Sequence, residues 1–172
     1  MGLDNIPGIY PCKREGTAVY SDNEQISCDK TIEVGGCPYH NEKSKDPIVS
    51  GINGVTGIVG VDCWYRGKYG NYLLYLMSKY NPPMDFYGLG LTNELGEEGI
   101  SEEDCLALSN WMKDHIEAFA KEVELAIESG SISVSENDSK QEVAQQMIRD
   151  WIYASWWLWF VSEFAEGSAI WY

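Results

Sequence analysis

Several residues in the first third of the chain have side chains suited to holding a metal ion. Cys37 and His40 stand in the segment CPYH, whose two-residue gap lets both side chains reach one ion, and Cys12 and Cys28 precede them. A tetrahedral Cys3His set of this kind is typical of structural zinc. The spacing matches no known zinc finger, so reduced structural cysteines are the alternative. One structural zinc is the single cofactor that the sequence suggests.

A small-ligand or catalytic pocket is a second hypothesis, with Cys63, Arg66, Lys68, Asn71 and His115 as its candidate residues. A thiol in the first turn of a helix has a lowered pKa, and a histidine within hydrogen-bond reach can act as its general base. The two cations and the amide could bind an anion between aromatic side chains. Two simpler interpretations are favoured. They are a histidine with a satisfied hydrogen bond at the edge of the core, and pairing of both cations with acidic residues.

Motifs that would fix a reaction are absent from the sequence. It contains no GxSxG, Walker loop, HExxH or dinucleotide fingerprint. We therefore assign no catalytic residue, and the sequence favours a protein that is not an enzyme.

The charge argues against direct binding to nucleic acid. The 172-residue chain has 27 acidic residues against 12 Lys and Arg, a formal net charge of −15. Proteins that bind nucleic acid draw their affinity from Lys and Arg on phosphates. Acidity suits a basic protein partner instead, and an acidic mimic of nucleic acid that inhibits a host enzyme is one form of that hypothesis.

One acidic cluster lies just before and inside the second expected helix. Its members are Glu94, Glu97, Glu98, Glu102, Glu103 and Asp104. The cluster lacks the alternating spacing of a calcium loop. A solvated face is the simpler interpretation, and a patch for a basic partner is the alternative.

The positions of the apolar residues predict a mainly α fold with a three-helix core at about 62–80, 101–128 and 139–166. The first helix carries a stripe of tyrosines and ends before the NPP segment. Ser101 is the expected N-cap of the second, which places Cys105 in the core. Ser139 and Glu142 form an S-x-x-E capping box for the third.

The segment WIYASWWLWF, in the third helix, is apolar on all sides. Such a helix is buried inside its own protein or covered by a partner. Because Trp and Tyr are favoured at interfaces, we expect Trp156, Trp159, Trp171 and Tyr172 to contact a partner. Burial of the segment within one chain would weaken that expectation. Gly167 is expected to end this helix, which leaves residues 168–172 as an aromatic tail.

The first 60 residues predict an irregular, cysteine-containing cap on a helical core at 61–172, the two forming a single domain. A short hairpin is expected around Ser21–Asn23. The opening MGLDNIPGIY lacks the features of a signal peptide, and the longest uncharged run near the C-terminus is too short to span a bilayer. We therefore expect a cytoplasmic protein that is not secreted and does not cross a membrane.

The segments MGLDNIP, GGCPY (35–39) and CWYRGKYGNYL (63–73) resemble parts of small proteins encoded by tailed bacteriophages. The resemblance covers the first half of the chain and brings no assigned activity with it. It implies an accessory role in a viral context, and for a viral protein the host cytoplasm as its location.

The leading hypothesis is therefore a non-enzymatic accessory protein that binds a protein partner through acidic and aromatic surface. The partner could be basic, or a second copy of the chain. The small-ligand pocket and the nucleic-acid mimic remain the alternatives.

Overall fold

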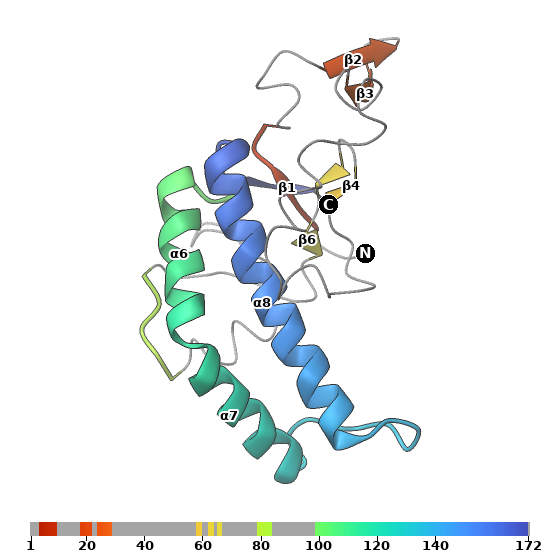
Figure 1. Cartoon of the computed structure of the whole chain (residues 1–172), viewed down its shortest axis with the longest axis vertical. Helices are drawn as coiled ribbons and strands as arrows, with labels where there is room; N and C mark the ends of the chain where they lie inside the picture. The colour runs from red at the N-terminus through yellow and green to blue at the C-terminus, as the bar shows by residue number, and fades with distance from the viewer. Residues whose placement is uncertain are drawn as a thin grey trace.

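The computed structural model describes residues 4–9, 18–21, 24–28, 58–59, 62–63, 65–66, 79–83 and 99–171. Its longest described stretch contains three helices: α6 (Glu102–Asp114), α7 (Ile116–Glu128) and α8 (Lys140–Phe164). Figure 1 shows α6 and α7 following one another along the side of the longer α8, and both contact it. The predicted mainly α class is confirmed.

Serine side chains fix the starts of α6 and α8, as predicted. The Oγ of Ser101 accepts a hydrogen bond from the backbone N–H of Asp104 at 3.1 Å. At α8, Ser139 Oγ accepts from the N–H of Glu142, and a carboxylate oxygen of Glu142 accepts from the N–H of Ser139, both at 3.1 Å. These two pairs satisfy N–H groups that the first turn of a helix leaves free. Hydrogen bonds from the Ser139 side chain and backbone lower the pKa of Glu142.

The single helix predicted for 101–128 is wrong at one residue, because the chain bends at His115 and divides into α6 and α7. The carbonyl of Trp111 accepts the backbone N–H of His115 at 3.1 Å and is also 2.8 Å from Nδ1 of the same residue. A side chain that enters the backbone hydrogen-bond ladder is a common cause of a helix bend. The predicted end at Ser129 is confirmed.

Trp151 of α8 contacts both shorter helices. Its Nε1–H donates to the carbonyl of Met112 at 2.8 Å, and its ring stacks on Phe119 with centroids 4.2 Å apart. One turn further along α8, Ser109 Oγ donates to the carbonyl of Ser155 at 2.6 Å. Small residues at this point let the backbones of α6 and α8 approach closely.

The segment 151–160 lies in this core. Its residues are buried except Ile152 and Trp159, which are half-buried. The largest fully buried side chains of the core are Trp151, Trp157, Tyr153, Phe119, Phe160, Leu108 and Met112. Of the two explanations for an all-round apolar helix, the structure favours burial within the chain.

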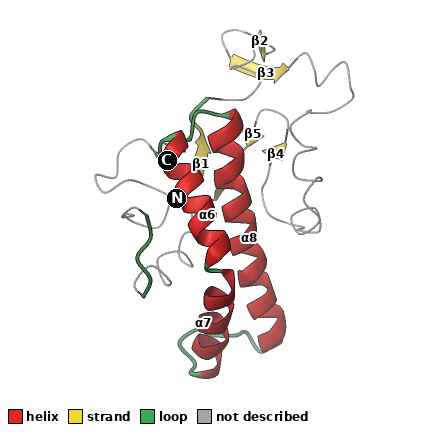
Figure 2. Ribbon diagram, turned by 60° about the vertical axis from the view of Figure 1, so that its left-hand side comes forward, coloured by secondary structure: helices red, strands yellow, loops and turns green. Residues whose placement is uncertain are grey.

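A three-stranded antiparallel sheet lies where α8 ends and α6 begins (Figures 1 and 2). Strand β1 (Asp4–Pro7) is central, between β6 (Tyr65–Arg66) and β7 (Ser168–Trp171). Residues 168–171 of the aromatic tail expected at 168–172 form β7. Their backbone pairs with β1 over its whole length, and this pairing satisfies polar groups that an irregular tail would leave to water.

The helix predicted from residue 62 is also wrong at its start. Residues 62–63 form β5, which pairs with β4 (Ile58–Val59), and residues 65–66 form β6, which pairs with β1. Backbone groups bonded to another strand cannot make the bonds of a helix turn, so strand pairing overrides the helical pattern. Strand β5 pairs with a neighbour in the sequence, and β6 pairs with the distant β1. Residues 67–78 of that predicted helix lie outside the described part of the chain.

The short hairpin expected around Ser21–Asn23 is confirmed. Strand β2 (Ala18–Ser21) pairs antiparallel with β3 (Glu24–Cys28), with Ser21 opposite Glu24. The two strands form a sheet of their own.

Two glycines allow the sheet to close against the start of α6. Ile100 and Ser168 exchange a pair of backbone hydrogen bonds, each 2.9 Å long. Beside them, Gly99 and Gly167 have φ values of +106° and +80°. A Cβ on Gly167 would lie 2.2 Å from the carbonyl oxygen of Ile100. Neither position therefore has space for a side chain.

Substituting Gly167→Ala should lower the free energy of unfolding by more than about 3 kcal/mol, because the new methyl group meets fixed backbone as well as a left-handed φ. Gly130→Ala is the matched control. Gly130 has φ +77° but nothing within 4 Å of its added Cβ, so this change should cost only about 1 kcal/mol. Urea unfolding of both variants measures the difference, and equal costs would contradict the close packing at Gly167.

Candidate functional site

The predicted zinc ligands fall mostly outside the described residues. Cys12, Cys37 and His40 lie there, and Cys28 is the last residue of β3. Among the residues that the structure describes, no group of three or more His, Cys, Asp or Glu side chains is arranged to hold a metal. The zinc site stays a prediction.

The structure removes one argument for a reactive Cys63. This residue lies in strand β5, so no helix N-terminus is present there to lower the pKa of its thiol. Arg66 lies in β6, directly opposite Asp4 of β1. The side chain of Arg66 lies outside what the structure describes, so its predicted roles stay predictions. Lys68 and Asn71 lie outside the described residues.

His115 is half-buried at the junction of α6 and α7. Because a carbonyl oxygen can only accept, the 2.8 Å contact with Trp111 requires the hydrogen to be on Nδ1. The neutral ring therefore has its lone pair on Nε2, which makes no hydrogen bond within the described part of the chain. Its ring stacks on Trp111 at 4.5 Å between centroids and meets Tyr80 edge to face at 5.4 Å.

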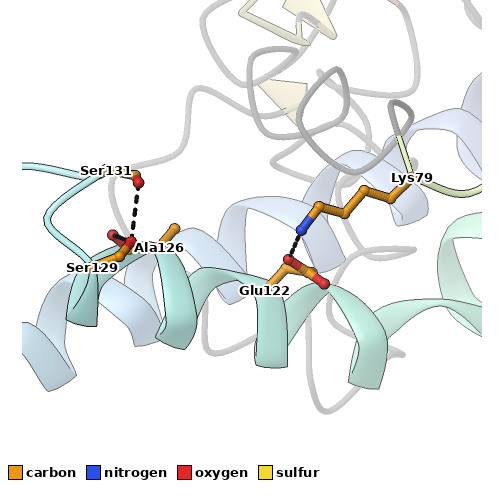
Figure 3. A network of polar contacts seen from close by, with 5 residues as sticks. All are labelled: Lys79, Glu122, Ala126, Ser129 and Ser131. Atoms are coloured by element: carbon orange, nitrogen blue, oxygen red, sulfur yellow. Dashed lines mark hydrogen bonds and ion pairs between the residues drawn. The ribbon is translucent and has the colours of Figure 1, made fainter.

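An ion pair next to this aromatic cluster joins the 79–83 segment to α7. Lys79 contacts the carboxylate of Glu122, as Figure 3 shows. With Tyr80 on His115, the pair attaches this segment at two points on the helical side of the molecule. These contacts favour the simpler interpretation of His115, a histidine with a satisfied hydrogen bond at the edge of the core, over a general base.

Cys105 is the one cysteine whose side chain the structure describes, and it lies in the core as predicted. It is fully buried, with its sulfur 3.6 Å from the carbonyl oxygen of Ile100. Burial raises the pKa of this thiol to about 12, against a smaller opposing effect of the backbone at Ser168. A neutral, enclosed thiol is a poor nucleophile.

A groove of about 440 Å³ lies between α7 and the first half of α8. Its lining residues are Glu124, Ile127, Glu128, Lys140, Gln141, Ala144, Gln145 and Ile148. One wall is acidic, the facing wall carries two amides and a lysine, and the floor is apolar. In the sequence, the groove is visible only as two pairs of polar residues spaced four apart, Glu124 with Glu128 and Gln141 with Gln145. Which two helix faces would meet depends on the bend at His115.

The polar side chains of this groove make no contacts with one another or with other described side chains. Within the described residues, no hydrogen bond or ion pair engages the side chains of Glu124, Glu128, Lys140, Gln141 or Gln145. Elsewhere on α8 the polar side chains are engaged, as in the 2.7 Å bond from Gln146 to Asp150 and the 2.9 Å bond from Arg149 to Gln146. The groove therefore presents exposed donors and acceptors, which a partner could bind, beside an apolar surface.

No protein-family model matches the chain, and no curated protein or solved structure is significantly similar to it. The resemblance to phage proteins therefore stays a prediction. Helices that are long and apolar enough to cross a membrane do not occur in the described residues.

Alkaline pH should destabilise the fold through Cys105. The folded-state pKa, about 12, is raised above the ordinary thiol value of 9.0, so the stabilisation is complete below pH 9 and is lost as the pH rises towards 12. Unfolding by urea, repeated from pH 8 to pH 11, should show a decline that is steeper for the native chain than for Cys105→Ala. The variant removes only the contribution of the thiol to the pH dependence of the unfolding free energy. Identical slopes of unfolding free energy against pH in both proteins would therefore contradict the raised pKa of Cys105.

The tautomer of His115 is open to direct measurement. Long-range nitrogen–proton NMR spectra of the neutral ring should show the proton on Nδ1, because the Trp111 carbonyl requires a donor there. A free histidine in the same buffer is the reference. Detection of the proton on Nε2 would contradict the bond that bends the helix.

Proposed function

We propose that the chain is a non-enzymatic accessory protein that binds a protein partner through the acidic surface formed by α7, the loop after it and the groove beside α8. The groove, with its unpartnered charges over an apolar floor, is the observation that carries this proposal. On the outside of α7, Leu125 is 48% exposed. An exposed leucine beside a groove of this kind suits contact with another protein.

Charge on this surface favours a basic partner. Exposed carboxylates outnumber exposed cations there, and they belong to Glu117, Glu124, Glu128, Glu136 and Asp138, against Lys121 and Lys140. Complementary charge speeds association and selects among partners. A second copy of the chain, which is equally acidic, is a poorer match.

Aromatic side chains contribute less to the proposed surface than the sequence led us to expect. Trp156 is 4% exposed and Trp159 is half-buried. The side chains of Trp171 and Tyr172 lie outside what the structure describes, so their contact with a partner stays a prediction. The acidic part of the original hypothesis is the part that the described surface supports.

Three further hypotheses stay open beside this one. A ligand or catalytic pocket at Cys63 loses the helix-terminus argument given above. An acidic mimic of nucleic acid is a special case of the present proposal, in which the partner is a nucleic-acid enzyme. A viral origin would make that partner a host protein.

Affinity purification of the tagged chain from its natural host, followed by mass spectrometry, tests the proposal. We expect a basic protein to be recovered with the native chain, and lost when α7 is reversed in charge by Glu124→Lys with Glu128→Lys. Glu103→Lys with Glu166→Lys is the control, because both residues are exposed and the pair changes the net charge equally outside the proposed surface. Raising the salt from about 50 to about 300 mM should release the partner. Recovery of no protein by the native chain would overturn the proposal.

A further inference from the structure

We propose that the groove between α7 and α8 binds an arginine side chain presented by the protein partner. The inference rests on the proposed interaction role and specifies the chemistry of its contact. It follows from the shape, the charge and the exposed hydrogen-bonding groups of the groove.

The acidic wall supplies the charge that would recognise a guanidinium. Glu124 and Glu128 are four residues apart on α7, and both line the groove without partners among the described residues. Residues four apart on a helix lie on one face. A guanidinium presents several N–H donors in a planar fork, which suits carboxylates better than the compact ammonium of a lysine does.

The opposite wall completes the set of acceptors. Gln141 and Gln145, also four apart, line the groove from α8, and their side-chain carbonyls can accept the N–H groups that the carboxylates do not use. A single cation, Lys140, stands where α8 begins. Repulsion from Lys140 should place the guanidinium nearer to Glu124 than to Glu128, because α8 runs antiparallel to α7 and leaves Glu124 further from that end.

The floor and the size of the groove fit the rest of an arginine side chain. Ile127, Ala144 and Ile148 form an apolar surface on which the methylene stem can lie while the charged head stays at the rim. A volume of about 440 Å³ is at the lower end of the range for small-molecule sites. It has room for one long side chain and part of its neighbour, which agrees with insertion from a protein surface.

NMR titration of the isotope-labelled full chain with a defined peptide tests this inference. The first peptide is alanine-based and carries arginine and leucine. The second replaces each arginine by citrulline, which keeps the shape and removes the charge, and the third replaces it by lysine. At about 150 mM salt, which screens general attraction, we expect amide shifts confined to residues 124–128 and 141–148. The arginine peptide should bind at least about tenfold more tightly than the citrulline peptide.

Variants separate the groove from the general charge of the chain. Glu124→Gln with Glu128→Gln should weaken binding of the arginine peptide about tenfold, with the larger share from Glu124→Gln alone. Glu103→Gln with Glu166→Gln removes the same charge outside the groove and the surface around it, and should change affinity less than about twofold. Ala144→Phe, which fills the floor and keeps the charge, should also weaken binding, and circular dichroism checks that each variant folds.

Several results would overturn the inference. They are equal weakening by the two glutamate pairs, shifts outside the groove, equal binding of the arginine and citrulline peptides, or no binding. Free arginine is titrated as well, and tighter binding of the amino acid than of the peptide would show a small-molecule site instead. If a natural partner is retained fully by Glu124→Gln with Glu128→Gln, the groove is excluded while the interaction role stands.

Discussion

Trp151 makes the contact on which the arrangement of the three helices depends. Its hydrogen bond to the Met112 carbonyl holds α6, and its stack on Phe119 holds α7. The two anchored residues lie on either side of the bend at His115, so one indole ring sets the positions of both shorter helices relative to α8. The line of α7 beside α8, and with it the groove, follows from this contact.

The two ends of the helical part are stabilised by different kinds of interaction. At the sheet, backbone hydrogen bonds and glycines hold segments that are distant in sequence, as between Ile100 and Ser168. At the far end, α7 meets α8 through side chains, and its outer surface is charged. Backbone bonds therefore hold the end with the sheet, whereas side-chain packing holds the end with α7. The charged outer surface of α7 can then contact a partner, as proposed, without disturbing the bonds of the sheet.

The sequence predicts well what is decided locally. Ser139 with Glu142 and Ser101 with Asp104 mark helix starts because each cap needs only residues within one turn. Burial of Cys105 follows equally from helical periodicity. Strand β6 at 65–66 could not be predicted this way, because its partners Asp4 and Asn5 lie far away in the sequence.

The groove shows the same limit at the level of a site. Its two walls are visible in the sequence as pairs such as Glu124 with Glu128, but nothing local states that these would face Gln141 and Gln145. Their meeting depends on the bend at His115, which requires a particular tautomer and a particular rotamer of one ring. A site formed between two helices can be predicted only when every contact that orients those helices can be predicted as well.

The open surroundings of Gly130 have a practical consequence for engineering. The turn from α7 to α8 is exposed at Ser131 and from Ser135 to Ser139, and a Cβ added at Gly130 would meet no atom within 4 Å. Exposed loop tips with small residues tolerate insertions best. A fluorophore or short epitope inserted near Asn137 would therefore sit within reach of the groove without entering the core, and the protein could carry its own reporter of binding.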